Sequence, residues 1–130
     1  IRDITGLKNN IYLGTNEGLS VLTKNDKKGE DYTITNYTEE NGLPSNKVRS
    51  LYVDSKGYVW IGTNKGIATL DPNNNIIDIS YIFEKIGVSD KFVRAVYEDS
   101  SGNYYIGCFL DGGLIKINPK TKKYTIYKNK

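Results

Sequence analysis

The sequence contains no histidine and no methionine, and it has a single cysteine, Cys108. Without histidine, a Ser/His/Asp or Cys/His nucleophilic arrangement cannot form, and the common His/Cys zinc sites are excluded. One cysteine cannot form an internal disulfide, and within an apolar strand pattern a free cysteine usually behaves as a small buried side chain. We therefore expect no catalytic residue, no metal ligands and no cofactor.

Long hydrophobic runs and a strong excess of one charge are also missing. The chain has no run of about eighteen apolar residues, so we expect this segment to make no membrane contact. The formal net charge is +3, and the lysine clusters at 24–28 and 120–123 stand in turn-like stretches. Solvated loops are the favoured interpretation of these clusters and a phosphate-binding patch is the alternative. We expect no nucleic-acid partner.

Glycine and tyrosine are abundant, with 13 and 11 copies, and hydrophobic residues make up 38% of the chain. Tyrosine, isoleucine and valine favour strands because flat or β-branched side chains pack well on a pleated surface. Glycine supplies the backbone conformations that tight turns need. A chain of 130 residues is also long enough to bury a core. These features predict an all-β protein with many tight turns.

One sequence pattern occurs three times along the chain, and such repeats decide the architecture. A block centred on Gly14 recurs around Gly62 and, more diverged, around Gly107, with steps of 48 and 45 residues. A second block, at residues 48–54, recurs at residues 93–99, and the chain opens on a shortened copy of it. Because the two blocks keep the same relative order, chance similarity is a poor explanation.

Each repeat contains four short strand candidates separated by turn signals. In the second repeat these strands are expected at residues 48–53, 59–62, 67–70 and 76–83. Four antiparallel strands in about 40–50 residues form the blade of a β-propeller. The sequence therefore predicts an all-β fold, a partial β-propeller of three four-stranded antiparallel blades. The blades are expected at about residues 1–40, 41–85 and 86–130.

Neighbouring blades should pack face to face, with the first strand of each blade nearest the propeller axis. The small Ser50 and Ala95 fit the crowding expected there. Trp60, with Tyr12 and Tyr105 at matching positions, is predicted to fill the gap between adjacent blades, and ligand stacking is the minor alternative.

The second repeat resembles a known family. Its Gly-Leu-Pro-Ser-Asn run at 42–46, its Asp-x-x-Gly hairpin at 54–57 and its Trp-Ile-Gly-Thr strand at 60–63 are similar to the two-component regulator propeller repeat. The third repeat keeps the pattern more loosely, and the first keeps mainly Leu-Gly-Thr-Asn at 13–16. Three repeats are fewer than the roughly four to eight blades of a closed ring, and the start at Ile1 suggests a segment of a longer protein.

The resemblance implies an extracytoplasmic, periplasmic or cell-surface part of a membrane-anchored bacterial receptor. Members of this family recognise glycans or other small molecules, and their receptors signal as dimers. The same resemblance implies that a kinase or other output domain would lie elsewhere in such a receptor.

The repeated carboxylates are interpreted as structural. Asp54 and Asp99 both begin a hairpin turn, where an aspartate accepts backbone hydrogen bonds, and an acid/base pair or a calcium site is the alternative. Residues 71–75 are acidic and rich in asparagine but lack the spacing and the closing glutamate of a calcium loop. A fragment of a propeller lyase or glycosidase is therefore the less favoured hypothesis, and we expect the chain not to be an enzyme.

The loops that join successive blades and the turns between second and third strands should share one end of the propeller. They cover residues 41–49, 86–94, 63–65 and 108–111. The candidate ligand-binding residues on this face are Arg49, Arg94, Asn64, Lys65, Phe109, Leu110 and Asp111. The recurring arginine, with Arg2 as a third copy, is interpreted first as a contact to the adjacent blade, with anion or sugar binding as the alternative. Phe109 and Leu110 place apolar side chains in a polar turn.

The favoured function is a non-catalytic sensing segment that binds a small molecule or a glycan or mediates receptor association. The alternative is a purely structural or self-associating segment. Because the two terminal blades would expose apolar faces, we expect them to pack on a second copy or on the remaining blades of a longer chain. Two copies of three blades would form a six-bladed ring.

Overall fold

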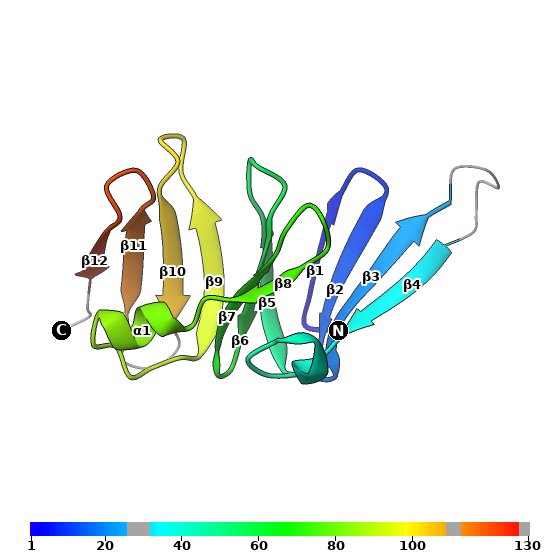
Figure 1. Ribbon diagram of the computed structural model, residues 1–130, viewed down its shortest axis with the longest axis horizontal. Coiled ribbons are helices and arrows are strands. Elements are labelled where there is room, and N and C mark those ends of the chain that lie inside the picture. The colour runs from blue at the N-terminus through cyan, green and yellow to red at the C-terminus, as the bar shows by residue number, and fades with distance from the viewer. Residues whose placement is uncertain (26–31, 109–112, 128–130) are drawn as a thin grey trace.

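The computed structural model describes residues 1–25, 32–108 and 113–127, which form three four-stranded antiparallel sheets side by side (Figure 1). Blade 1 consists of β1 (Asp3–Leu7), β2 (Asn10–Thr15), β3 (Gly18–Lys24) and β4 (Tyr32–Tyr37). Blade 2 consists of β5 (Val48–Val53), β6 (Val59–Thr63), β7 (Gly66–Leu70) and β8 (Ile76–Asp78). Blade 3 consists of β9 (Val93–Glu98), β10 (Tyr104–Cys108), β11 (Leu114–Asn118) and β12 (Lys123–Tyr127). The predicted fold class is confirmed. Within the described ranges, no helix is long and apolar enough to cross a membrane.

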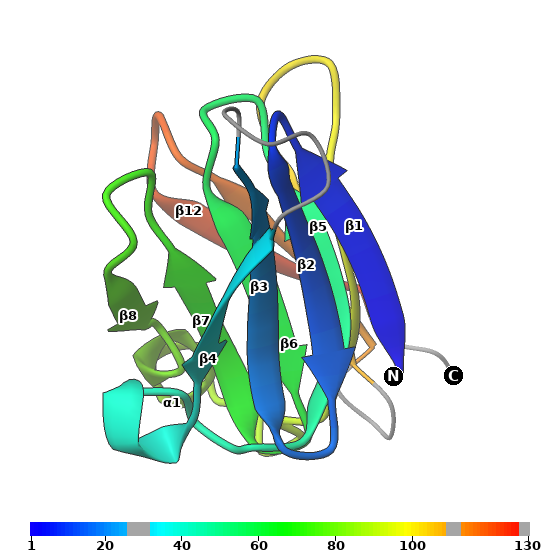
Figure 2. The same ribbon diagram turned by 90° about the vertical axis from the view of Figure 1, so that its right-hand side faces the viewer.

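The first strands of the three blades, β1, β5 and β9, lie next to one another at the inner edge (Figure 2). A Cβ atom at Gly14 would come within 2.8 Å of Val48 Cγ1, and one at Gly62 within 2.7 Å of Val93 Cγ1. The recurring glycine is therefore needed because a valine of the next blade packs directly on its backbone. The predicted crowding near the axis is confirmed at Ser50, which is buried, whereas Ala95 at the equivalent place in blade 3 is exposed.

Two apolar cores fill the gaps between blades. The core between blades 1 and 2 contains Tyr12, Leu19, Val21, Leu43, Val48, Leu51, Val59, Ile61, Ala68 and Leu70. The core between blades 2 and 3 contains Trp60, Ile67, Ile82, Phe83, Val88, Val93, Val96, Tyr104, Ile106 and Ile115. Trp60 stacks on Tyr104 with ring centroids 4.5 Å apart. Trp60 and Tyr12 thus fill the gaps as predicted, while Tyr105 occupies the matching position on the outward face of blade 3 and is half-buried.

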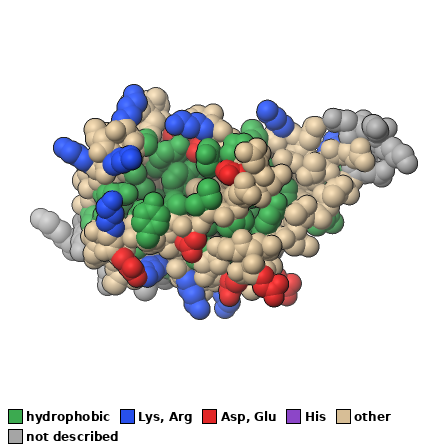
Figure 3. Space-filling view, in the orientation of Figure 1, with side chains coloured by type: hydrophobic (Ala, Val, Ile, Leu, Met, Phe, Trp, Pro, Cys, Tyr) green, Lys and Arg blue, Asp and Glu red, His purple; other side chains and the backbone are tan. Residues whose placement is uncertain are grey.

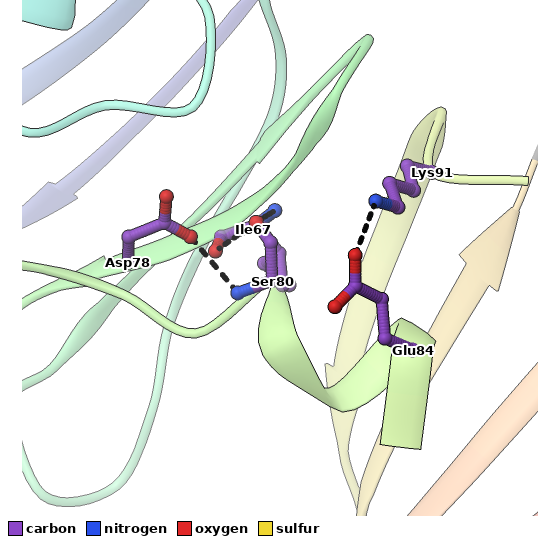
Figure 4. A network of polar contacts seen from close by, with 5 residues as sticks. All are labelled: Ile67, Asp78, Ser80, Glu84 and Lys91. Atoms are coloured by element: carbon purple, nitrogen blue, oxygen red, sulfur yellow. Dashed lines mark hydrogen bonds and ion pairs between the residues drawn. The ribbon is translucent and has the colours of Figure 1, made fainter. Parts of the chain in front are cut away.

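The fourth strand of blade 2 is shorter than the predicted 76–83. It ends at Asp78, and helix α1 (Tyr81–Lys85) follows. Ser80 Oγ accepts a hydrogen bond from Ile67 N at 2.9 Å and donates one to Ile67 O at 3.2 Å, so a side chain takes the place of strand pairing (Figure 4). Asp78 Oδ1 accepts from Ser80 N at 2.9 Å and turns the chain away from the sheet.

Helix α1 buries Ile82 and Phe83 against blade 3, and the ion pair of Glu84 with Lys91, 3.6 Å apart, joins the helix to the chain that follows it (Figure 4). The apolar run that predicted a long strand is therefore divided between a strand, whose Ile76 packs on the core between blades 1 and 2, and a helix, whose Ile82 and Phe83 belong to the core between blades 2 and 3. Hydrophobicity over so few residues does not separate these two structures.

The Gly-Leu-Pro-Ser-Asn run connects blade 1 to blade 2, after the short 3-10 helix η1 (Glu39–Asn41). Gly42 ends this helix with a φ of 110°, a left-handed conformation that suits glycine. Leu43 is buried between the two blades, and Asn46 exchanges two hydrogen bonds with Glu39. Each of these residues therefore fixes the path of the chain into the inner strand β5.

Candidate functional site

The connections between blades, with η1 and α1, lie at one end of the molecule, opposite the β1–β2, β5–β6 and β9–β10 hairpins (Figure 1). We call the former the loop end and the latter the hairpin end. At the loop end Thr63 Oγ1 accepts from Lys65 N and donates to Gly66 O, which fixes the β6–β7 turn. Thr15 makes the same pair of bonds in the β2–β3 turn. The predicted common end for these loops is confirmed for the described residues.

Three arginines line one depression of about 420 Å³ at the inner edge of the loop end, which we call the axial depression. Arg49 is the extra residue of a β-bulge, because Val48 pairs with Thr63 and Ser50 pairs with Gly62. Arg94 is the extra residue at the equivalent place in blade 3, and Arg2 precedes the equivalent pair in blade 1. A bulge redirects a side chain out of the regular alternation of a strand. The remaining lining residues are Ile1 and Asp3.

Arg49 is held by two neighbouring elements. Its Nη1 donates to Asn16 Oδ1 of blade 1 at 2.7 Å, and its guanidinium lies 6.0 Å from the ring centroid of Phe92. Its Nε is buried and has no acceptor among the described residues. The bond to Asn16 is the contact to an adjacent blade that the sequence suggested, and its acceptor is a side-chain amide oxygen.

A second depression at the loop end, of about 570 Å³, is formed by three connections, and we call it the peripheral depression. Its lining residues are Pro44, Asn64, Lys65, Ser89, Asp90, Lys91 and Phe92. Asn64 N donates to Lys47 O, while the buried Asn64 Oδ1 has no partner in the part of the chain that the structure covers. Lys65 is exposed. The structure thus brings Asn64 and Lys65 together in one depression and Arg49 and Arg94 in the other.

Phe109, Leu110 and Asp111 lie outside the described residues. Sequence reasoning did not select Asn16 or Phe92 as site residues. Asn16 is the first-repeat counterpart of the candidate Asn64 and could have been found by that repetition, whereas Phe92 precedes a strand without any motif of its own. Their place beside Arg49 depends on the packing of separate blades, which the sequence does not display.

The hairpin aspartates are fully engaged in structural bonds. Asp54 accepts from Lys56 N and Tyr58 N through Oδ1, and from Trp60 Nε1 and Tyr104 OH through Oδ2. In blade 3 the backbone N–H of Asn103 is the main cause that lowers the pKa of Asp99 to about 2.

The turn that begins at Asp71 is also held by a carboxylate that accepts backbone hydrogen bonds. Asp71 Oδ1 accepts from Asn73 N and Asn75 N, and these bonds account for the acidic turn without an ion. The structural interpretation of these carboxylates is supported.

Cys108 is half-buried at the end of β10. Burial, and secondarily the charge of Asp90, raise the pKa of the Cys108 thiol to about 11. The thiol is therefore protonated at neutral pH, and a protonated thiol is a poor nucleophile.

Apolar side chains gather across the middle of one face of the molecule, while acidic side chains lie mainly toward the loop end (Figure 3). A groove of about 360 Å³ between blades 2 and 3 is lined in part by Trp60, Ile77 and Tyr104. Trp60 and Tyr104 are each less than a tenth exposed, so they offer little surface to a ligand. We assign this groove to packing between blades.

Comparison with known proteins agrees with this architecture. A model of the two component regulator propeller family matches residues 42–65. The histidine kinase P4 of Formosa agariphila is 29% identical over 140 aligned positions, which cover 69% of this chain and 10% of the kinase. The chain therefore spans only a small part of this relative.

Two solved structures share the fold. The extracellular domain of the hybrid two component system BT3049 from B. thetaiotaomicron superposes with a TM-score of 0.77 at 23% identity, over 98% of this chain and 17% of that one. The extracellular domain of the one component system BT4673 from the same organism gives a TM-score of 0.73 at 22% identity, over 98% of this chain and 18% of that one. Residues 42–65 thus match the two component regulator propeller family, and the three blades share their fold with these two extracellular domains.

Proposed function

We propose that this chain is a non-catalytic sensing segment of an extracytoplasmic receptor, and that it binds a glycan or another small molecule at its loop end. The observation that carries the proposal is the pair of depressions that open at this end, both built from equivalent elements of successive blades. Ligand sites of this size, with a few convergent polar groups, are typical of recognition surfaces. The names of the similar proteins, a histidine kinase and two extracellular receptor domains, support the setting.

The absence of catalysis is argued from the reactive groups. Asp54 and Asp99 each accept several hydrogen bonds within their own hairpin, at the end of the molecule opposite both depressions. Cys108 is protonated at neutral pH. A general acid or base must reach its substrate with a free proton site, and these groups do not meet that requirement.

The experiment is a binding screen of the chain against neutral and charged oligosaccharides, followed by NMR. Binding at the loop end should shift the backbone signals of residues 63–65 and 89–92 and leave the hairpin signals in place. Lys65→Ala should weaken binding to the peripheral depression, whereas Lys56→Ala, which removes the same charge at the hairpin end, should not. Signals that move only at the hairpin end would contradict the proposal.

A second candidate function is association through the terminal blade faces, and the exposure of apolar side chains favours it. Ile4 and Ile34 on the outward face of blade 1 are 61% and 62% exposed. Their register equivalents in blade 2, Leu51 and Ile76, face the core between blades 1 and 2. Tyr97 and Tyr127 are exposed on blade 3. We propose that a second copy of the chain covers these faces and completes a six-bladed ring.

Light scattering and analytical ultracentrifugation of the chain over a range of concentrations test this association. We expect a dimer, and Ile4→Lys with Ile34→Lys should convert it to a monomer because two buried charges would be unpaired at the interface. A wild-type protein that stays monomeric at high concentration would rule the second copy out. Lys56→Ala serves as the control because Lys56 lies on neither terminal face.

A further inference from the structure

We infer that the axial depression is a subsite for a compact anion, a carboxylate or sulfate group carried by a small saccharide-sized ligand. This inference rests on the proposed function and deepens it by naming the ligand chemistry. The observation behind it is that one residue type, arginine, stands at the same register position of all three inner strands and lines a single depression.

The register explains why the three side chains meet. Arg2, Arg49 and Arg94 each precede the residue that pairs with the recurring glycine, and their strands lie next to one another. Two of them sit in bulges, which turn a side chain away from the packed faces between blades. The side chains therefore leave the sheets at the inner edge, where the strands converge.

The charge of the depression is strongly one-sided. Its lining contains three guanidinium groups and one carboxylate, that of Asp3. Both oxygens of Asp3 are engaged with backbone N–H groups, Oδ1 with Ile4 and Oδ2 with Leu51 at 2.8 Å. Asp3 therefore serves to join blades 1 and 2. Like charges held together attract a counter-ion, and a positively charged concave surface raises the local concentration of anions.

Arg49 is also positioned before any ligand arrives. Asn16 and Phe92 hold its guanidinium from two sides, and its buried Nε lacks an acceptor among the described residues. A guanidinium fixed in this way loses little conformational freedom on binding, which favours affinity. The planar fork of arginine matches the paired oxygens of a carboxylate or a sulfate, whereas a neutral hydroxyl uses only one of its donors.

The test compares two sugars that differ in one group. Glucuronate carries a carboxylate where glucose carries a hydroxymethyl group, and both are titrated into the chain with NMR detection of the signals of residues 2, 49 and 94. We expect glucuronate to bind at least about tenfold more tightly than glucose, since a hydrogen bond to a charged group is worth about 1.5–3 kcal/mol. Arg94→Gln and Arg2→Gln, both at exposed positions, should each weaken glucuronate binding by about tenfold.

Lys56→Gln is the matched control, because it removes one positive charge from the hairpin end and leaves the depression intact. An equal loss in Lys56→Gln and Arg94→Gln would show general charge screening and would overturn the inference. Equal binding of glucose and glucuronate at the loop end would also overturn it, while leaving the proposed function in place. If neither these sugars nor any member of the wider screen shifts a loop-end signal, the proposed function fails as well.

Discussion

The two interfaces between blades differ at the hairpin end, although the same fold produces both. Between blades 2 and 3, Tyr104 OH donates to Asp54 Oδ2 at 2.9 Å, and Glu98 accepts from Ser55 N and Ser55 Oγ at 2.8 and 2.7 Å. Between blades 1 and 2 the same region is a gap of about 360 Å³ lined in part by Leu7, Lys8 and Lys56. At the hairpin end, polar bonds thus join blades 2 and 3, whereas the bonds of Asp3 and Arg49 that join blades 1 and 2 lie at the loop end.

Differences in residue type account for this contrast. Counted from the recurring glycine, the pair Gly6–Ile11 in blade 1 is equivalent to the pair Val53–Val59 in blade 2. The chain between the paired residues is one residue shorter in blade 1, so its hairpin is shorter. Leu7 takes the place of the hairpin aspartate, which removes the acceptor. Blade 2 in turn presents Val59 where blade 3 presents Tyr104, which removes the donor.

The interface between blades 1 and 2 thus lacks both the donor and the acceptor of this hydrogen bond. Neither interface buries one of the two groups without the other. An unpaired buried polar group costs more than a matched apolar pair, because it loses its hydrogen bonds to water and gains none in return. We conclude that the hairpin positions of successive blades must be matched across each gap. The general blade pattern and the chain order set the fold, and the residues at the hairpin positions set whether polar bonds or apolar side chains face one another across each gap.

The largest effect is expected from Asp54→Ala. The substitution leaves Trp60 Nε1 and Tyr104 OH buried without an acceptor, and we expect a loss of about 3 kcal/mol in the free energy of unfolding. Asp99→Ala removes the equivalent carboxylate from the more exposed hairpin of blade 3 and should cost clearly less. Urea denaturation of both variants measures the difference. Equal losses would show that the bond between blades adds nothing beyond the hairpin itself.

Gly62→Ala should have the next largest effect. A Cβ at this position would overlap Ser50 Oγ and come within 2.7 Å of Val93 Cγ1, and overpacking of this kind costs about 2 kcal/mol. Gly107→Ala is the matched control in blade 3, where the nearest atom, Ala95 Cβ, would lie at 3.9 Å. We expect Gly107→Ala to be neutral or slightly stabilising, because glycine loses more backbone freedom on folding. Thermal unfolding of the two variants tests this pair.

Tyr104→Phe separates the hydrogen bond from the packing. The ring can still stack on Trp60, while the bond to Asp54 is removed, so we expect a loss of about 1 kcal/mol in the free energy of unfolding. Tyr105→Phe removes the bond to Asp99 on the outward face and should cost less, since water replaces it there. A loss in Tyr104→Phe as large as that in Asp54→Ala would mean that the bond between Tyr104 and Asp54 alone accounts for the destabilisation by Asp54→Ala.

The sequence predicted the blades well because their signals are local. The spacing of Gly14, Gly62 and Gly107 and the turns between them depend on residues close together in the chain. The end of β8 was predicted wrongly because Ser80 replaces strand pairing through its side chain, an event that hydrophobicity does not reveal.

The candidate site was predicted only in part. Repetition singled out Arg49 and Arg94, but their meeting with Arg2 depends on bulges and on the approach of three inner strands. The partners Asn16 and Phe92 come from another blade and from a loop, so their contacts with Arg49 depend on packing that the sequence does not display.

The smallest expected effect is a change in the free energy of unfolding at acidic pH. It concerns Asp99 and so separates this aspartate from Asp54. Hydrogen bonds, first that from Asn103 N, lower the pKa of Asp99 to about 2, so its ionised form stabilises the folded state. That stabilisation is complete above the unfolded-state pKa of about 4 and disappears as the pH falls through about 2. The difference in unfolding free energy between the wild type and Asp99→Asn should therefore be constant near neutral pH and shrink between these two values. Urea titrations at a series of acidic pH values measure it, and a difference that stays constant down to about pH 2 would show that the charge of Asp99 contributes nothing beyond the shape of the turn.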